Sequence, residues 1–508
     1  MTAAASEEQD LRLCFLAALT VATLFLFAGW RSLGNSLWWG AVDRVALRAV
    51  VYTAFACAYA LVVTISCTFL FLISRGSLKS QRYGSAVGTL ILGMLVTNCV
   101  RQAIGFSVSE FAAIIQQPLV LCSLLSLLSI CVTSASRWPS ATSRIFVSTL
   151  AAFSPFSAVQ AATLWFNESR FEMSRDAPPT FGTAITPGLR AVIVVFDELD
   201  AEEVQRNLPS LPGFGTLINR STSFSSVVAP SERTLTSIPA MFTGHHVDSV
   251  STDGSFRLWI RDQQTSASFP ARETIFGDAV VLGRQSRVAG WHLPYCSSSF
   301  DLPVADCAYF ASMRVPTDVL GGIIYFLGAG WGDWSLTPNR TRLFSWRRAE
   351  LQRFLDRAAG FTLERDAGLV FLHYPVPHLP SRFDRATGDL RSRASFASNE
   401  EQYFDNLILA DRILSRLLAD LEAKHLLDAG WLVVTADHGN RNRRPFENHI
   451  PLIVRAPGGK LVGVDTTSAS PMCLRRFVRS VFQQTDRSPS EHLRALRYAD
   501  TTRLSPCL

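Results

Sequence analysis

Long apolar runs fill the first third of the chain and predict helices that cross a membrane. Five of them reach the length of about 20 residues that a helix needs to span the hydrocarbon core of a bilayer. They cover residues 11–30, 47–73, 86–106, 111–133 and 146–166. The first run is followed by further spans and has no convincing cleavage site, so we do not interpret it as a signal peptide. We expect a bundle of about five transmembrane helices over residues 1–166.

Basic residues between these runs predict how the bundle is oriented, because short cytoplasmic loops carry an excess of Lys and Arg. The loop after the second run holds Arg75, Lys79 and Arg82. The loop after the fourth run holds Arg137 and Arg144. Both loops are expected inside, and an odd number of spans then puts everything after the last one outside. The sequence predicts a multi-pass protein of a bacterial-type inner (plasma) membrane, with its C-terminal part on the periplasmic or extracellular side.

Beyond the apolar third, short strand-like runs alternate with helix-like segments. Four runs are apolar and end abruptly in polar residues, as buried strands of an α/β sheet do. They cover residues 191–198, 368–374, 431–437 and 451–454. Residues 403–427 repeat leucine at helical spacing. We predict a mostly parallel sheet covered by helices over residues 189–508, joined to the membrane part by a polar, Pro-containing linker at residues 167–188.

Composition and charge exclude one class of partner. Of the 508 residues 48% are hydrophobic, and the excess lies in the predicted membrane part. The formal net charge of +6 is modest, and the chain has no basic run and no RNA-binding motif. We therefore expect no nucleic-acid partner.

Four of the ten cysteines lie in the predicted α/β domain and bear on its compartment. Cys296, Cys307, Cys473 and Cys507 allow three pairings, and the sequence alone does not choose between them. We favour Cys296–Cys307 and Cys473–Cys507, which would imply an oxidising compartment and agree with the orientation inferred from the loop charges. The alternative is four free thiols in a cytosolic domain.

Polar residues at the ends of two predicted strands could bind a metal ion. Asp437 and His438 end one apolar run, and Asp197 ends another. Ligands of open α/β sheets bind at the carboxyl ends of the strands, and carboxylate and imidazole groups bind divalent cations. The alternative is that these residues only form turns. For the nearby Asp200 we prefer that alternative, as the N-cap of the next helix.

A stretch rich in hydroxyl groups, residues 229–244, offers a nucleophile. It places Ser231, Thr234, Thr236 and Ser237 where a helix could start, and the free N–H groups of a helix N-terminus favour phosphate. A hydroxyl held against a divalent cation is activated as a nucleophile. The alternative is that these residues are ordinary helix caps.

All nine histidines lie in the predicted α/β domain. His373 and His378 follow one strand-like run, in a Pro-rich loop, and His449 precedes another. With Asp437 and His438 they form a plausible set of ligands for one or two metal ions. The remaining histidines have no obvious partners and are interpreted as surface or core residues: His245, His246, His292, His425 and His492.

Taken in order, these motifs resemble those of the alkaline phosphatase–sulfatase superfamily. Asp197 at a strand end is followed by TLTSIPAM, HYPVPH, YFDN, TADHGN and NHIPLIV. With several predicted spans ahead of them, the chain is most similar to the membrane phosphoethanolamine transferases and the related phosphoglycerol transferases that build lipoteichoic acid. The matching motifs extend over residues 190–455.

The resemblance implies a nucleophile and a first metal site. Thr234 matches the nucleophile, because it lies five residues before Pro239, whereas Thr236 fits that spacing less well. Asp197, Asp437 and His438, together with Thr234, match the ligands of a divalent metal. This metal is most often zinc, with manganese or magnesium as alternatives.

The resemblance further implies a substrate-binding role for two histidines. His378 and His449 match residues that bind the phosphate of the donor or a second metal ion. The implied reaction moves phosphoethanolamine or phosphoglycerol from a membrane phospholipid to a glycan or lipid of the cell envelope, through a phospho-threonine intermediate.

The sequence departs from that pattern in three places. Ser231 and Ala240 stand where the transferases acting on lipid A have cysteines, and Asp197 stands where they have Glu. The C/S-x-P-x-R motif of sulfatases is missing from the nucleophile stretch, so sulfate ester hydrolysis is not expected. The alternatives to the transferase are a membrane-anchored phosphodiesterase or phosphatase of the same superfamily and a catalytically silent domain that binds envelope components.

Overall fold

The computed structural model describes residues 3–34, 45–75, most of 190–498, Cys507 and scattered positions between 77 and 154. Beyond residue 190 the undescribed stretches are 251–256, 262–263, 297–299, 311–337 apart from residues 320, 323 and 327, then 393–394, 396, 444–445 and 485. The chain divides into two compact units. The first comprises Met1–Glu172 and Arg314–Leu336, and the second comprises Met173–Met313 and Thr337–Leu508.

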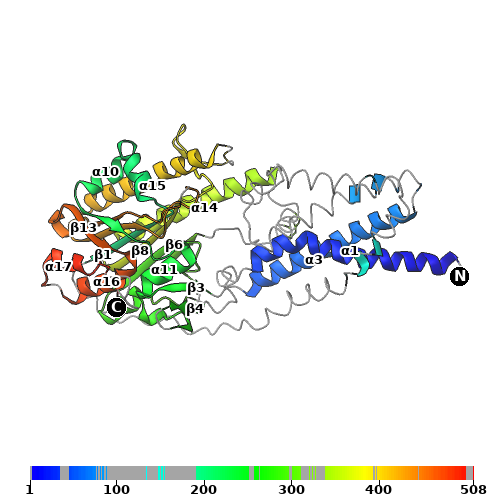
Figure 1. Cartoon of the computed structure of the whole chain (residues 1–508), viewed down its shortest axis with the longest axis horizontal. Coiled ribbons are helices and arrows are strands. Elements are labelled where there is room, and N and C mark those ends of the chain that lie inside the picture. Colours follow the sequence, from blue (N-terminus) through cyan, green and yellow to red (C-terminus); the bar gives the residue numbers. More distant parts are fainter. Residues whose placement is uncertain are drawn as a thin grey trace. The chain divides into compact units, whose positions relative to one another are not determined.

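Two long helices, α1 (Ala3–Gly34) and α3 (Val45–Arg75), lie side by side in the first unit (Figure 1). They cover the first two predicted spans. Ala18, Ala22 and Ala54 are fully buried in their contact, and small residues there let two helices approach closely.

A segment of α3, Thr53–Leu72, is long and apolar enough to cross a membrane, and it is the one such segment among the described residues. Apart from residues 87, 88, 133, 147, 148, 150–152 and 154, the predicted spans at 86–106, 111–133 and 146–166 lie outside the described residues. The predicted linker at 167–188 lies outside them too. The bundle of about five spans and its orientation therefore stay predictions.

An eight-stranded sheet forms the centre of the second unit, in the order β13-β2-β12-β11-β1-β8-β6-β7. Its strands are β1 (Arg190–Asp197), β2 (Thr222–Val227), β6 (Gln285–Trp291), β7 (Asp306–Phe310), β8 (Ala367–Pro377), β11 (Gly430–Ala436), β12 (Leu452–Arg455) and β13 (Gly463–Ala469). Only β12 runs against its neighbours, β11 and β2, and the other pairs are parallel. The prediction of a mostly parallel sheet is confirmed.

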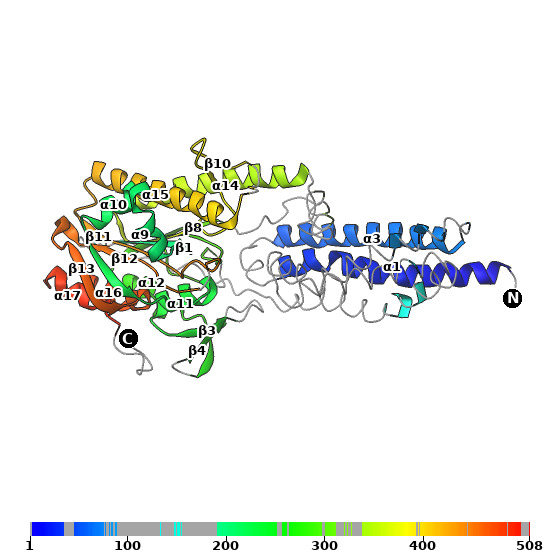
Figure 2. The same cartoon turned by 45° about the horizontal axis from the view of Figure 1, so that its top comes forward.

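Helices cover both faces of this sheet (Figures 1 and 2). One layer contains α10 (Pro212–Ile218), α14 (Pro338–Leu363) and α15 (Asn399–Ala423). The other contains α11 (Thr234–Thr243), α12 (Ile275–Val281), α16 (Leu474–Gln483) and α17 (Pro489–Arg494). The predicted leucine-rich helix is α15, which begins at a capping box of Ser398 and Glu401 and buries its leucines.

Shorter elements complete the second unit. Strands β3 (Val247–Val250), β4 (Arg257–Ile260) and β5 (Thr265–Ser268) form a separate sheet, and β9 (Phe383–Asp384) pairs with β10 (Asp389–Leu390). A short helix, α9 (Ala201–Arg206), follows β1. Among the described residues, 3-10 helices span Leu208–Ser210, Ala271–Glu273, Pro457–Gly459 and Pro471–Cys473.

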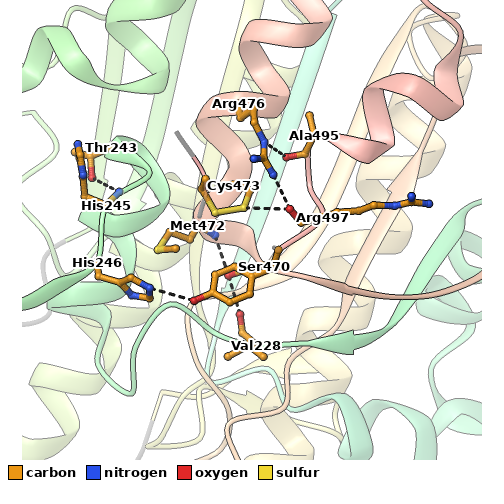
Figure 3. The surroundings of a disulfide bond; sticks show 12 residues. Val228, Thr243, His245, His246, Ser470, Met472, Cys473, Arg476, Ala495 and Arg497 are labelled. Carbon is orange, nitrogen blue, oxygen red and sulfur yellow. Dashed lines mark hydrogen bonds between the residues drawn. A yellow bond between two sulfur atoms is a disulfide. The ribbon is translucent and has the colours of Figure 1, made fainter. Parts of the chain in front are cut away.

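Both favoured disulfides are present. Cys296 is bonded to Cys307 and Cys473 to Cys507, with Cα atoms 5.7 and 4.7 Å apart. Beside the second bond, Arg476 donates to the main-chain carbonyl oxygens of Ala495 and Arg497, which follow α17 (Figure 3). These cross-links fit the oxidising compartment that the sequence predicts for this unit.

The register of the central strands positions the candidate site. All eight residues of β1 are buried, as expected for a strand covered by helices on both faces. β1 is parallel to β11, and Phe196 is paired with Ala436. Asp197, the last residue of β1, and Asp437, which follows β11, therefore lie side by side at the carboxyl edge of the sheet.

Candidate active site

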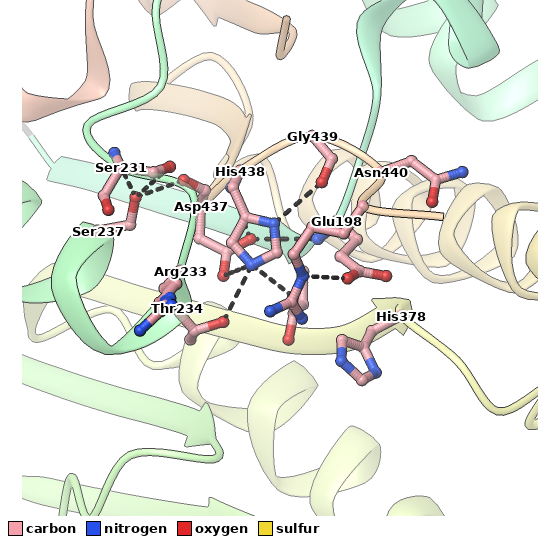
Figure 4. Close-up of polar contacts among 12 residues, drawn as sticks. Glu198, Ser231, Arg233, Thr234, Ser237, His378, Asp437, His438, Gly439 and Asn440 are labelled. Atoms are coloured by element: carbon pink, nitrogen blue, oxygen red, sulfur yellow. Dashed lines mark hydrogen bonds and ion pairs between the residues drawn. The ribbon is translucent and has the colours of Figure 1, made fainter. Parts of the chain in front are cut away.

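Four side chains predicted as nucleophile or metal ligands converge at the carboxyl ends of β1 and β11. Figure 4 shows three of them, Thr234, Asp437 and His438. The Nε2 atom of His438 lies 3.6 Å from Oδ1 of Asp197 and 3.4 Å from Oδ2 of Asp437. It also lies 3.3 Å from Oγ1 of Thr234, the first residue of α11. The two aspartates and the histidine are fully buried, and Thr234 is 7% exposed. Sheet register and the placement of α11 thus bring together residues from three separate parts of the sequence.

The polar atoms of this group are not satisfied by one another. Within the described part of the chain, both carboxylate oxygens of Asp197 and Oδ2 of Asp437 are buried without a hydrogen-bond partner. The Nδ1 atom of His438 lies 3.0 Å from the carbonyl oxygen of Gly439 and donates to it, and Nε2 is directed at the two carboxylates. Two buried carboxylates this close repel each other unless a cation lies between them. This donor set fits a divalent cation such as zinc or manganese.

Burial and neighbouring charges shift the pKa values of Asp197 and Asp437. Burial raises the pKa of Asp197, and the negative charge of Asp437 raises it further. Burial also opposes ionisation of Asp437, but the neighbouring His438 and His373 outweigh it and lower its pKa. Without a cation the pair therefore favours one protonated and one ionised carboxyl group, as closely spaced carboxylates do.

Main-chain hydrogen bonds orient the Asp437 carboxylate. Its Oδ1 accepts from the N–H groups of Glu198, at 3.1 Å, and of His438, at 2.8 Å. The hydroxyl of Ser237, in α11, donates to the carbonyl oxygen of Asp437 at 2.6 Å. The helix that carries the candidate nucleophile is thereby tied to the end of β11.

The neighbouring hydroxyl groups have local partners. The Oγ1 atom of Thr236 donates to the carbonyl oxygen of Arg233 at 3.1 Å and lies 2.6 Å from Oγ of Ser231. Thr236 therefore stabilises the first turn of α11, while Thr234 faces His438 (Figure 4). This arrangement favours Thr234 over Thr236 as the nucleophile.

Residues of the YFDN motif in α15 hold the loops around the site. The hydroxyl of Tyr403 donates to the carbonyl oxygen of Glu198 at 2.8 Å and accepts from the N–H of Asp200 at 3.2 Å. Asn406 donates to the carbonyl oxygen of His378 at 2.8 Å. The carboxylate of Asp200 accepts from the first N–H groups of α9, which confirms its predicted role as an N-cap.

The two histidines expected to bind phosphate or a second metal lie in different surroundings. The N–H of His378 donates to the carbonyl oxygen of Asp197 at 3.1 Å, and burial lowers the pKa of its ring. His449 is instead 61% exposed, with Nδ1 3.4 Å from a carboxylate oxygen of Glu447 and 3.9 Å from one of Glu202. The proposed role of both histidines stays a prediction.

Two further histidines flank the centre: His373, which the sequence offered as a candidate ligand, and His292, to which it assigned no role. The Nε2 atom of His373 is 3.9 Å from Oδ2 of Asp437, and Tyr295 hydrogen-bonds its Nδ1 at 2.7 Å. Burial lowers the pKa of His373 to about 3. His292, interpreted as a residue without partners, interacts with the charges of His378 and Asp437, and chiefly burial lowers its pKa to about 4. The HYPVPH motif pointed to His373, but only the pairing of β8 with β1 puts it beside Asp437.

No protein-family model matches the chain, and a search of curated proteins finds no similar sequence. Several solved structures resemble it. The PsFucS1 sulfatase from Pseudoalteromonas sp. is 14% identical over 63% of this chain and 72% of its own, with a TM-score of 0.42. The lipoteichoic acid synthase LtaP from Listeria monocytogenes is 14% identical over 61% and 76%, with a TM-score of 0.38. The phosphonate monoester hydrolase of Agrobacterium radiobacter is 10% identical over 58% and 74%, also with a TM-score of 0.38. Similarity at this level assigns neither family nor function, so the functional argument depends on the site itself.

Proposed function

We propose that the second unit belongs to the alkaline phosphatase–sulfatase superfamily and catalyses metal-dependent phosphoryl transfer. One observation carries the proposal: the Thr234 hydroxyl meets Asp197, Asp437 and His438 in a buried group, and three of its four carboxylate oxygens lack hydrogen-bond partners among the described residues. A hydroxyl nucleophile beside a cation site is the arrangement that this chemistry requires. The whole chain is then a membrane transferase that moves phosphoethanolamine or phosphoglycerol from a phospholipid to an envelope glycan or lipid.

Asp197, Thr234, Asp437 and His438 would hold the first metal ion. A bound divalent cation supplies positive charge that stabilises negative charge on oxygen atoms at the reacting centre. The buried residues of the site orient the ligands and the nucleophile. Sheet register fixes the two carboxylates, the Gly439 carbonyl fixes the tautomer of the histidine, and Ser237 anchors the helix that starts at the nucleophile.

The transfer proceeds in two steps. In the first, Oγ1 of Thr234 forms a bond to the phosphorus atom of the phospholipid, and the bond from phosphorus to the diacylglycerol oxygen breaks. The threonine proton is lost and the diacylglycerol oxygen gains one, which leaves a phosphodiester between the threonine and the headgroup. In the second, a hydroxyl of the acceptor attacks the same phosphorus and loses its proton, while the bond from phosphorus to the Thr234 oxygen breaks and that oxygen gains a proton. His378 and His449 are proposed to bind the phosphate or a second metal ion.

The proposed location is the outer face of a bacterial-type inner membrane. The candidate span in α3 and the two disulfides support a membrane-anchored domain in an oxidising compartment. Such a location would keep the active site close to a phospholipid donor and to acceptors in the envelope.

A mass spectrum of the peptide that contains Thr234, taken from protein isolated from its own membrane, tests the proposal. We expect an added phosphoethanolamine or glycerophosphate group on Thr234, which would identify both the nucleophile and the donor headgroup. A bare or simply phosphorylated threonine would count against transfer and in favour of a hydrolase. An adduct on Thr236 would contradict the assignment of the nucleophile.

A further inference from the structure

A charged pair beside the candidate active site has no part in the mechanism above. Glu198 directly follows Asp197, and only 3% of its side chain is exposed. Its Oε1 accepts a hydrogen bond of 2.7 Å from Nε of Arg441. Arg441 lies three residues after His438. Each member of the pair therefore closely follows a candidate metal ligand, at the end of β1 or just after β11.

The backbone holds Glu198 in a conformation that non-glycine residues rarely adopt, with φ at 65°. Its N–H donates to Oδ1 of Asp437 at 3.1 Å, and its carbonyl oxygen accepts from Tyr403 at 2.8 Å. A left-handed residue in a buried turn persists only where the surroundings enforce it, and such residues gather at functional sites. The carboxylate of Glu198 is thereby held against Arg441.

The positive charge of Arg441 interacts with more than its direct partner. It is attracted by Glu198, and also by Asp197 and Asp437. The side chain is nevertheless 42% exposed, so the guanidinium group is accessible from solvent. A guanidinium group is planar and donates in a fixed fork, which suits the oxygen atoms of a phosphate group.

The carboxylates of Asp197, Glu198 and Asp437 at one edge of the sheet would repel an anionic phosphate ester. Arg441, which hydrogen-bonds Glu198, supplies a positive charge that opposes this repulsion. We propose that Arg441 binds a non-bridging oxygen of the phosphate group of the substrate, and that Glu198 is the positioning residue that holds the guanidinium in place. The inference rests on the proposed function, because it takes a phosphate ester as the substrate.

Calorimetric titration of the purified full-length protein with inorganic phosphate tests the role of Arg441, with metal content measured on the same samples. We expect R441Q to weaken phosphate binding by about 10- to 100-fold, the range for a hydrogen bond to a charged group. R441K, which keeps the charge but loses the fork, should weaken it less. The metal content should stay at the wild-type value. Phosphate affinity within twofold of wild type in R441Q, or loss of metal from it, would overturn the proposal.

The neighbouring Arg443 provides a matched control. Its guanidinium lies 3.4 Å from Asp200 and also pairs with Glu202, so its charge is used at the start of α9. R443Q removes an equal positive charge two residues from Arg441, and this charge belongs to a partly exposed ion pair. Phosphate affinity should therefore stay within about twofold of the wild-type value. An equal loss in R441Q and R443Q would show a general effect of surface charge and would overturn the specific role of Arg441.

The positioning role of Glu198 has its own test. E198Q should weaken phosphate binding by less than R441Q does, and the double variant E198Q/R441Q should bind no more weakly than R441Q alone, because Glu198 acts through Arg441. R441Q alone leaves the buried Glu198 carboxylate without its partner, which could prevent folding. The double variant removes that charge as well, so the test can still be made if R441Q does not fold. Additive losses in the double variant would contradict the positioning role.

These outcomes are separable from those of the proposed function. If Thr234 carries no adduct but R441Q weakens phosphate binding, the transferase proposal fails and the anion-binding role of Arg441 stands. If Thr234 carries the adduct but R441Q binds phosphate as wild type does, only the present inference fails.

Discussion

The described residues of the second unit include two groups that each combine two carboxylates with a histidine, one buried and one exposed. The buried centre consists of Asp197, Asp437 and His438. The exposed cluster consists of Glu202, Glu447 and His449. In each group one ligand atom per residue lies within 4.8 Å of the others, so distance does not distinguish them.

The surroundings of the two groups differ in how charge is balanced. The side chains of the exposed cluster are between 42% and 61% exposed, and Arg443 pairs with Glu202. Water and ion pairing satisfy these charges at little cost. The buried centre has no water-exposed atoms to relieve it, and three of its carboxylate oxygens have no partner within the described residues. Unbalanced buried charge, and not proximity, is therefore the feature that marks a cation site.

The largest expected effect separates the two threonines next to the buried centre. Thr234→Ala should lower phosphodiester turnover by roughly 10³- to 10⁶-fold, as removal of a nucleophile does. Thr236→Ala removes only hydrogen bonds within the first turn of α11 and should lower turnover by less than about tenfold. Steady-state kinetics on purified full-length variants measures both. Comparable activity in the two variants would refute the assignment of Thr234.

Metal content provides the next contrast. Asp437→Asn should weaken metal binding by at least about 100-fold, because it removes a ligand that main-chain hydrogen bonds have already oriented. The double variant Glu202→Gln/Glu447→Gln should keep the metal content of the wild type, because it changes only the exposed cluster. Elemental analysis of dialysed protein measures both. Loss of metal from the exposed-cluster variant would reverse our ranking of the two groups.

The metal-free protein should show the repulsion within the buried centre. Because the pKa of Asp197 is raised in the folded state, that state binds more protons than the unfolded chain above the ordinary pKa of 3.8. Stability should therefore fall as pH rises from about 4 through the raised pKa. Asp197→Asn should remove this dependence and stabilise the metal-free protein by about 1–3 kcal/mol at neutral pH. Thermal unfolding with chelator at several pH values checks this, and an unchanged profile in the variant would contradict it.

The smallest effect is expected at His449. Its ring is 61% exposed beside two exposed carboxylates, so His449→Ala should not measurably shift the thermal midpoint. The same variant tests the role that the resemblance implies. A higher KM with unchanged metal content would support phosphate binding by His449, and unchanged kinetics would restrict that role to His378.

Local features of the fold could be predicted where one strand or helix carries the whole signal. The apolar runs at 191–198 and 431–437 became β1 and β11, and the leucine spacing of 403–427 became α15. The strands β2, β6, β7 and β13 were not predicted. Several of their positions are polar, as in TSFSSV of β2 and GVDTTSA of β13, so neither a continuous apolar run nor a strict alternation marks them.

The sequence by itself determined which chemical groups stand at strand ends, because an apolar run that stops at Asp197 or Asp437 needs no distant partner to be recognised. Only the tertiary structure decided which of these groups meet. Strand order puts β1 between β11 and β8, and this order brings His373 to the centre. His449, in contrast, faces Glu202 and Glu447 at the surface. Strand order and register depend on packing between residues far apart in the chain, so no local pattern encodes them.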